Sequence, residues 1–108
     1  PRSRRIENRI PGADANPYLA IAATLASIWL GLREQRMPSK PRTKSGEGLA
    51  TLPRNLDVAL DALQKAKPLH EALGHDFVTL FIEVKRAEAE AFLQVISPWE
   101  REFLLLNV

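Results

Sequence analysis

The chain has 108 residues, of which 45% are hydrophobic and 26% charged, and its formal net charge is +2. This length allows one small domain, and the apolar content is typical of a globular protein and argues against intrinsic disorder. Cysteine is absent, which excludes a disulfide scaffold and a thiolate metal site and fits a reducing, cytoplasmic location.

Residues 5–10 alternate in character, which predicts a short strand. Arg5, Glu7 and Arg9 share one face, and the other face holds Ile6, Asn8 and Ile10. Paired guanidinium groups can grip phosphate or carboxylate groups. A carboxylate between them can neutralise the arginines or ligate a hard cation such as Mg²⁺ or Mn²⁺. Spacing alone also allows a simple row of surface ion pairs.

A helix is predicted at 16–35, after the Pro-Gly turn that ends the strand. Asn16 can cap it, and Pro17 suits the first helical position, where no N–H is needed. The helix is apolar nearly all round, so we expect it to be buried on several sides. Its apolar run is shorter than the roughly 20 residues of a membrane span, and Thr24 and Ser27 interrupt it, so no membrane segment is predicted.

The segment 36–51 is predicted to be a loop, because proline and glycine recur there among charged residues. The cationic side chains of this segment are Lys40, Arg42 and Lys44. They could contact an anionic ligand or another subunit, or they could simply be solvated. The remainder, 52–108, is predicted to be helical. Asn55 and Asp76 are candidate caps, Gly74 closes a short helix at 68–73, and the motif "SPWE" forms a capping box at 97–100.

Three further side chains have ordinary structural interpretations. His70 and His75 lie five residues apart with no carboxylate arranged around them, so we expect surface or capping roles. Tyr18, just inside the predicted helix, is expected to pack its ring and leave a polar tip.

The stretch "RRIENRIPGADANPYLAIAATLA" resembles the C-terminal signature region of glutamine synthetases. It is most similar to members of that superfamily that join glutamate to amines or polyamines. The stretches "LPRNLDVALDAL", "LGHDFVTLFIEVKRAEAEAF" and "SPWEREFLLLNV" are similar to the end of such proteins. The resemblance implies that 1–108 is the C-terminal part of an α+β catalytic domain, and that this part is mainly α-helical with a short N-terminal strand.

The resemblance also implies an ATP-dependent ligase of nitrogen metabolism that joins the γ-carboxylate of glutamate to ammonia or an amine through a γ-glutamyl phosphate. Glu7 would ligate Mg²⁺ or Mn²⁺, Arg5 would contact the ATP phosphates, and Arg9 would hold glutamate and the transferred phosphoryl group. The family's other ligands lie upstream, so this segment alone is expected to be inactive. A cytoplasmic homo-oligomer of stacked rings is expected. The acceptor stays open, with a lean toward amines or polyamines.

Two other functions are weighed against the ligase. A non-catalytic helical interaction or oligomerisation module would use the apolar run at 17–32 and the apolar stripe at 77–95. Nucleic-acid binding through the basic residues at 2–9 is disfavoured, because no aromatic residues are interleaved and Glu7 opposes it. We therefore predict neither a nucleic-acid partner nor a membrane partner.

Overall fold

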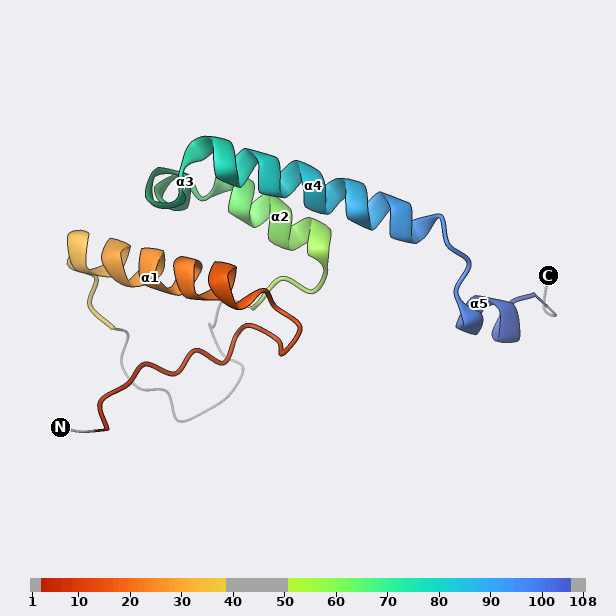
Figure 1. Ribbon diagram of the computed structural model, residues 1–108, viewed down its shortest axis with the longest axis horizontal. Coiled ribbons are helices and arrows are strands. Elements are labelled where there is room, and N and C mark those ends of the chain that lie inside the picture. The colour runs from red at the N-terminus through yellow and green to blue at the C-terminus, as the bar shows by residue number, and fades with distance from the viewer. Residues whose placement is uncertain (1–2, 39–50, 106–108) are drawn as a thin grey trace. The chain divides into compact units, whose positions relative to one another are not determined.

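The computed structural model describes residues 3–38 and 51–105 (Figure 1). The chain divides into two compact units, the first formed by Pro1–Thr51 with Ala66–His75 and the second by Leu52–Lys65 with Asp76–Val108. The helices are α1 (Pro17–Arg33), α2 (Leu56–Lys65), α3 (Lys67–Leu73), α4 (His75–Leu93) and α5 (Pro98–Phe103). The predicted mainly helical character is confirmed.

Helix α1 begins where its cap predicts. The Asn16 side chain accepts hydrogen bonds from the backbone N–H groups of Tyr18 and Leu19, at 3.0 and 3.3 Å, and Pro17 occupies the first turn. These bonds satisfy N–H groups that have no partner inside the helix. The predicted role of Asn16 is therefore confirmed.

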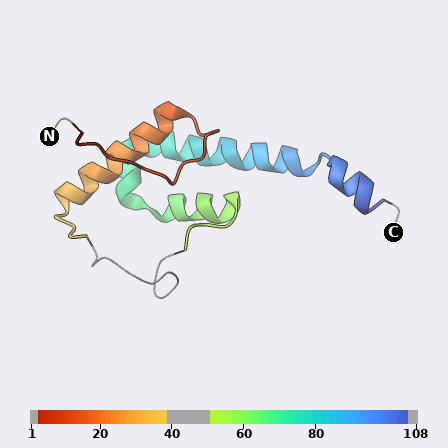
Figure 2. The ribbon, with the colours of Figure 1, turned by 90° about the horizontal axis from the view of Figure 1, so that it is seen from below.

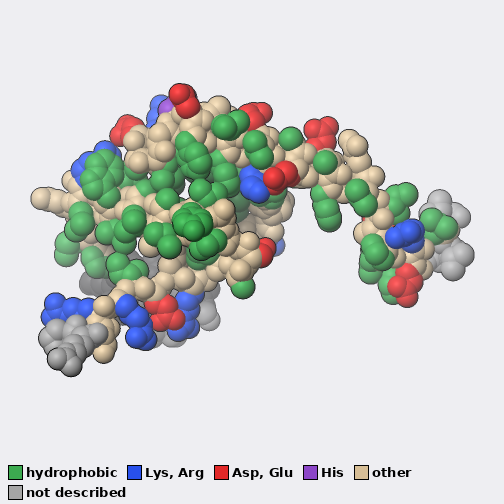
Figure 3. All heavy atoms as spheres, in the orientation of Figure 1, with side chains coloured by type: hydrophobic (Ala, Val, Ile, Leu, Met, Phe, Trp, Pro, Cys, Tyr) green, Lys and Arg blue, Asp and Glu red, His purple; other side chains and the backbone are tan. Residues whose placement is uncertain are grey.

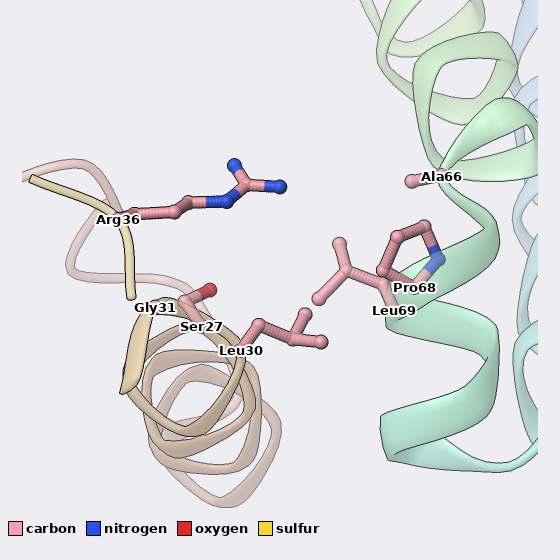
Figure 4. Close-up of a pocket in the computed structure, with 7 residues that line it drawn as sticks. All are labelled: Ser27, Leu30, Gly31, Arg36, Ala66, Pro68 and Leu69. Atoms are coloured by element: carbon pink, nitrogen blue, oxygen red, sulfur yellow. The ribbon is translucent and has the colours of Figure 1, made fainter. Parts of the chain in front are cut away.

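Helix α1 packs against α3 within the first unit. Leu30, which is 7% exposed, and Leu69 point toward one another between the two helices (Figure 4). Arg33 and Glu71 add an ion pair at 3.4 Å at the exposed edge of this contact. The packing fixes α1 relative to α3 mainly through apolar side chains.

The expected burial of the 16–35 helix is not met within this chain. Ala26 and Leu30 are its buried residues, whereas Ile21, Leu25 and Leu32 are 58%, 60% and 75% exposed. Hydrophobic side chains accordingly gather on the surface over this helix (Figure 3). Burial of its remaining faces stays a prediction for the full protein.

Gly74 ends α3, as predicted. Its φ of 94° is a backbone conformation that L side chains rarely adopt, and its N–H donates to the His70 carbonyl at 2.9 Å. Helix α4 then begins at His75, so Asp76 lies in its first turn instead of preceding it as a cap. Gly74 thus supplies the backbone conformation at which α3 ends.

In the second unit, α2 and α4 run antiparallel beside one another (Figures 1 and 2). Arg86 of α4 donates to Asp61 at 2.9 Å and to Gln64 at 3.1 Å, both on α2. The Asn55 side chain caps α2 by accepting from Val58 N–H at 2.9 Å. The buried residues of these two helices are Leu60, Val78 and Ile82.

Helix α5 begins at the predicted capping box. The Ser97 hydroxyl accepts from Glu100 N–H at 3.1 Å, and the Glu100 carboxylate accepts from Ser97 N–H at 2.7 Å. Both hydrogen bonds of the motif are therefore present.

The predicted strand at 5–10 is wrong for this structure, which has no strand in the part of the chain that it describes. A strand requires ladder hydrogen bonds from a neighbouring strand, and no described residue supplies them. The segment instead runs beside α1 as irregular chain (Figures 1 and 2). Its alternation survives in part, since Ile6 and Asn8 line a groove against α1.

The predicted loop at 36–51 falls mostly outside the described residues. Lys40, Arg42 and Lys44 all lie in that part, and the described flanks at 36–38 and 51 are not helical. Among the described residues, no helix combines the length and apolar character that crossing a bilayer requires.

Candidate functional site

The structure brings Glu7 and Arg9 together at the start of the chain. Arg9 Nε donates to Glu7 Oε1 at 2.9 Å, and the two side chains are 84% and 57% exposed, respectively. Arg5 is also exposed, but it forms no ion pair with any residue that the structure describes. Of the three predicted site residues, Glu7 and Arg9 therefore form an ion pair, and Arg5 takes no part in it.

The exposure of the Glu7–Arg9 pair decides what it can do. An ion pair in open solvent contributes little to folding stability, typically about 0–1 kcal/mol. The pair is instead accessible to ligands. Arg9 keeps donors that can bind a carboxylate or phosphate, and Glu7 keeps a second carboxylate oxygen.

The donor set fits only part of a divalent metal site. Mg²⁺ needs about six oxygen ligands in octahedral geometry, several of which are commonly water and phosphate oxygens. Glu7 can supply one hard carboxylate ligand. No group of three or more His, Asp or Glu side chains that could hold a metal occurs among residues 3–38 and 51–105. Any such ion would therefore need further ligands from outside this described part.

A chain of hydrogen bonds ties the segment that carries Glu7 to α1. The Asn8 side-chain amide donates to the Thr24 hydroxyl at 3.0 Å, and the Thr24 hydroxyl donates to the Ala20 carbonyl at 2.8 Å. The Asn8 carbonyl oxygen also accepts from Ile10 N–H at 3.1 Å. Sequence reasoning missed this link, although a polar Asn8 on the apolar face of the segment was a signal.

These side chains line an open groove of about 430 Å³ between the segment and α1. Its walls are mainly apolar and include Ile6, Pro11, Ala20, Ile21 and Ile28. Asn8 and Thr24 are thus the polar exceptions in an apolar contact.

A second pocket, of about 280 Å³, lies between α1 and α3 (Figure 4). Its single charged residue is Arg36, whose Nε donates to Glu34 Oε2 at 2.5 Å. This hydrogen bond, helped by the Arg36 charge, lowers the pKa of the Glu34 carboxyl below its ordinary value. Because Arg36 is already neutralised and the other lining side chains are mainly apolar, this pocket offers little chemistry.

The remaining candidates have surface positions. His70 and His75 face each other with their Nδ1 atoms 3.3 Å apart, and one ring can donate to the other. Tyr18 is 82% exposed, so the expected packing of its ring is not made within this chain.

Comparison with known proteins defines the class. The family described as glutamine synthetase, catalytic domain, matches residues 1–104. The chain belongs to this family, and the resemblance read from its motifs is confirmed. No solved structure matches the chain significantly.

Curated relatives agree with this assignment. The chain is 35% identical over 109 residues to a glutamine synthetase of Methanococcus maripaludis, covering 92% of this chain and 24% of the relative. It is 39% identical over 103 residues to that of Pyrococcus abyssi, covering 86% and 23%. It is 32% identical over 101 residues to a gamma-glutamylethanolamide synthetase of Streptomyces coelicolor, covering 92% and 22%. The chain thus spans about a quarter of the length of these relatives.

Proposed function

We propose that the full protein is an ATP-dependent ligase that joins the γ-carboxylate of glutamate to ammonia or an amine through a γ-glutamyl phosphate. Membership of the glutamine synthetase family supports this class of reaction. The observation that carries the proposal is the accessible pair of Glu7 and Arg9, a carboxylate beside a guanidinium. A site that holds a metal ion, nucleotide phosphates and a carboxylate substrate together needs both kinds of side chain.

Glu7 is proposed as one ligand of Mg²⁺ or Mn²⁺. Such an ion, when bound, would neutralise charge on the phosphate oxygens of ATP and of the transferred phosphoryl group. The protein's part is to present the carboxylate in a fixed place. Arg9 lies within hydrogen-bond distance and limits the positions that this carboxylate can take.

The two arginines are proposed to bind anions. Arg5 would contact the ATP phosphates, and Arg9 would hold glutamate and stabilise the charge on the phosphoryl group during transfer. Guanidinium groups suit both tasks because they donate two parallel hydrogen bonds to carboxylate or phosphate. Charge stabilisation of this kind is usually the largest single contribution to such catalysis.

The acceptor and the assembly are parts of the same proposal. Relatives named glutamine synthetase and gamma-glutamylethanolamide synthetase both align with this chain, and we propose ammonia, monoamines and polyamines as candidate acceptors. We propose a cytoplasmic homo-oligomer of stacked rings. We also propose that the 108 residues alone are inactive, because Glu7 supplies a single ligand.

A second candidate function is a non-catalytic helical interaction or oligomerisation module. Exposed apolar side chains on α1 and α4 favour it, including Ile21 and Leu25 on α1 and Phe92 and Leu93 on α4. Such surfaces commonly bind other protein segments. The same surfaces are also expected on a segment of a larger catalytic domain.

The test is ADP release by the full protein with glutamate, ATP and Mg²⁺, adding ammonia, ethanolamine, putrescine and spermidine in turn. We expect acceptor-dependent release, and we expect Glu7→Gln to lower kcat/KM by about 100-fold or more because it removes a charge at the phosphoryl site. Glu83→Gln is the matched control, since Glu83 is an exposed glutamate on α4. Equal activity of wild type and Glu7→Gln would overturn the assigned role.

A further inference from the structure

We propose that Asn8 and Thr24 form a positioning pair that holds Glu7 and Arg9 in place for the ligase reaction. This inference rests on the proposed function, because it concerns the same side chains. Neither Asn8 nor Thr24 is assigned a contact with a substrate. Their role is exerted through the backbone that carries the reactive pair.

The directions of the hydrogen bonds are mutually consistent. Thr24 uses its single hydroxyl proton on the Ala20 carbonyl at 2.8 Å, so its lone pairs can accept from the Asn8 amide at 3.0 Å. The Asn8 carbonyl oxygen is used separately, by Ile10 N–H at 3.1 Å. This arrangement fixes which end of the Asn8 amide faces the helix. Reversing the amide would place its NH₂ group against the Ile10 N–H.

Asn8 is well placed for its hydrogen bond to Thr24 to influence the Glu7–Arg9 pair. It lies between Glu7 and Arg9 in sequence, and it is bonded to the helix while those two side chains pair with each other in solvent. A hydrogen bond at the middle residue limits how far the adjoining backbone can move away from α1. A loss of this bond would therefore move both reactive groups together.

The apolar side chains of this segment are only loosely packed in the part of the chain that the structure describes. Ile6 and Ile10, the apolar residues on either side of Asn8, are each 70% exposed. Among the described residues, the Asn8–Thr24 bond is the one side-chain hydrogen bond between residues 3–11 and α1. Within residues 3–38 and 51–105, no strand ladder holds the segment. The polar link is thus a principal local restraint.

Helix α1 is a suitable support for such a restraint. It is 17 residues long, capped by Asn16 and packed on α3 through Leu30. The turn before it is closed by the Ala15 N–H bond to the Gly12 carbonyl at 3.2 Å. The segment is therefore held at the turn and again at Thr24, and Glu7 lies just beyond the second point. Sites are held most precisely when they are tied to rigid elements in this way.

The chain offers a matched control on the same helix. Ser27 donates to the Ala23 carbonyl at 2.8 Å, in the same i to i−4 geometry as Thr24, but it makes no hydrogen bond to the segment. Removing the Ser27 hydroxyl therefore tests the loss of a hydrogen bond to the i−4 carbonyl within α1, without any loss of a bond to the segment. Thr24→Ser keeps the hydroxyl and serves as the conservative variant.

The experiment measures kcat and KM of the full protein with the best acceptor, normalised to folded protein, for Thr24→Val, Asn8→Leu and the double variant. We expect each single variant to lower kcat about tenfold while KM for ATP changes less than about threefold, because displaced charges lose transition-state stabilisation. The double variant should resemble either single one, since both break the same link. Thr24→Ser should restore kcat, and Ser27→Ala should leave it near wild type.

Three kinetic results would overturn the positioning role, and the first two concern the control and the double variant. One is a loss with Ser27→Ala equal to that with Thr24→Val, which would indicate a general effect on the helix. The other is multiplication of the two single effects in the double variant, which would indicate independent roles. Unchanged kcat in both single variants would overturn it as well.

A structural measurement separates this inference from the proposed function. If the wild-type protein releases no ADP with any acceptor, the ligase proposal fails by itself. Electron cryomicroscopy maps of wild type and Thr24→Val then decide the positioning role. A displaced or disordered Glu7 carboxylate in the variant, against an ordered one in wild type and Ser27→Ala, supports it. An unchanged Glu7 position overturns it.

Discussion

Asn16 is the residue whose local role is best defined, because its side chain accepts from two backbone N–H groups at the start of α1. We predict that Asn16→Ala weakens this end of the helix by about 1 kcal/mol, which corresponds to about fivefold faster amide exchange at Tyr18 and Leu19. Hydrogen–deuterium exchange with mass spectrometry on the full protein measures it. Asn16→Asp keeps an acceptor and should exchange like wild type; equal acceleration by both variants would contradict the capping role.

Hydrogen bonds between residues close in the sequence could be predicted, whereas the hydrogen bond between Asn8 and Thr24 could not. Asn16 and Ser97 each bond to backbone groups within three positions, so their motifs contain the whole interaction. The Asn8–Thr24 bond spans 16 positions and depends on the path of the chain between them. Alternation placed Asn8 on the face opposite Glu7 but could not name its partner.

At the scale of elements, replacing glycine by alanine is expected to change stability in opposite directions at Gly74 and at Gly31. Gly74 has φ 94°, so Gly74→Ala is expected to destabilise the α3–α4 junction by about 1–3 kcal/mol. Gly31 lies inside α1, and a Cβ there meets nothing within 4 Å, so Gly31→Ala is expected to stabilise the helix by about 0.5–1 kcal/mol. Urea unfolding of the 108-residue chain at low concentration measures both. Shifts of the same sign would contradict the backbone argument.

Helix α5 is expected to depend on pH through its capping box. Hydrogen bonds from the Ser97 backbone N–H and side chain lower the pKa of Glu100 below its ordinary value. The stabilisation is therefore fully present above the unfolded-state pKa of about 4.3 and is lost as pH falls through the lower, folded-state pKa. Carboxyl and amide chemical shifts of Glu100 followed from pH 7 to 2 measure it.

The control for this titration is Glu100→Gln, which keeps a hydrogen-bond acceptor without a titrating group. Its α5 amide shifts should not change over the same acidic range. A Glu100 carboxyl that titrates at its ordinary pKa would contradict the presence of the capping box in solution.

Helices could be predicted because their signals are local, whereas the strand at 5–10 could not be settled from its own sequence. Pro17 and the Ser97 motif each mark a helix start by hydrogen bonds made within one turn. Strand formation depends on a partner that the alternating residues do not specify, and none of the described residues provides one. Ile6 and Asn8 do line a groove against α1, but Glu7 lines a neighbouring part of that surface too, so the two faces of the predicted strand are not separated.

At the scale of the whole molecule, the described residues contain only a few of the side chains that a metal- and phosphate-binding site needs. Glu7 and Arg9 are paired here, and the described residues hold no cluster that would complete a metal site. The chain spans about a quarter of the length of its relatives. Sequence reasoning could identify the family from its motifs, but these motifs place only Glu7 as a candidate metal ligand among the described residues.

The exposed apolar surface leads to a prediction for the isolated chain. Ile21 and Leu25 on α1 are 58% and 60% exposed, and Phe92 and Leu93 on α4 are 74% and 79% exposed. Because folded monomers rarely expose large apolar patches, we expect the 108-residue chain to self-associate as its concentration rises. Light scattering coupled to size-exclusion chromatography should show a mass above 12.1 kDa.

The matched variants separate apolar association from a charge effect. Leu25→Lys places a charge on the exposed face of α1 and should lower the apparent mass, whereas Glu83→Lys changes charge on an already polar part of α4 and should not. A folded chain that stays monomeric at every concentration would count against a segment of a larger catalytic domain. It would favour the helical interaction module, because such a module must remain soluble before it meets its partner. A monomeric chain therefore favours the interaction module without any assay of activity, whereas self-association is expected both of a catalytic segment and of an oligomerisation module.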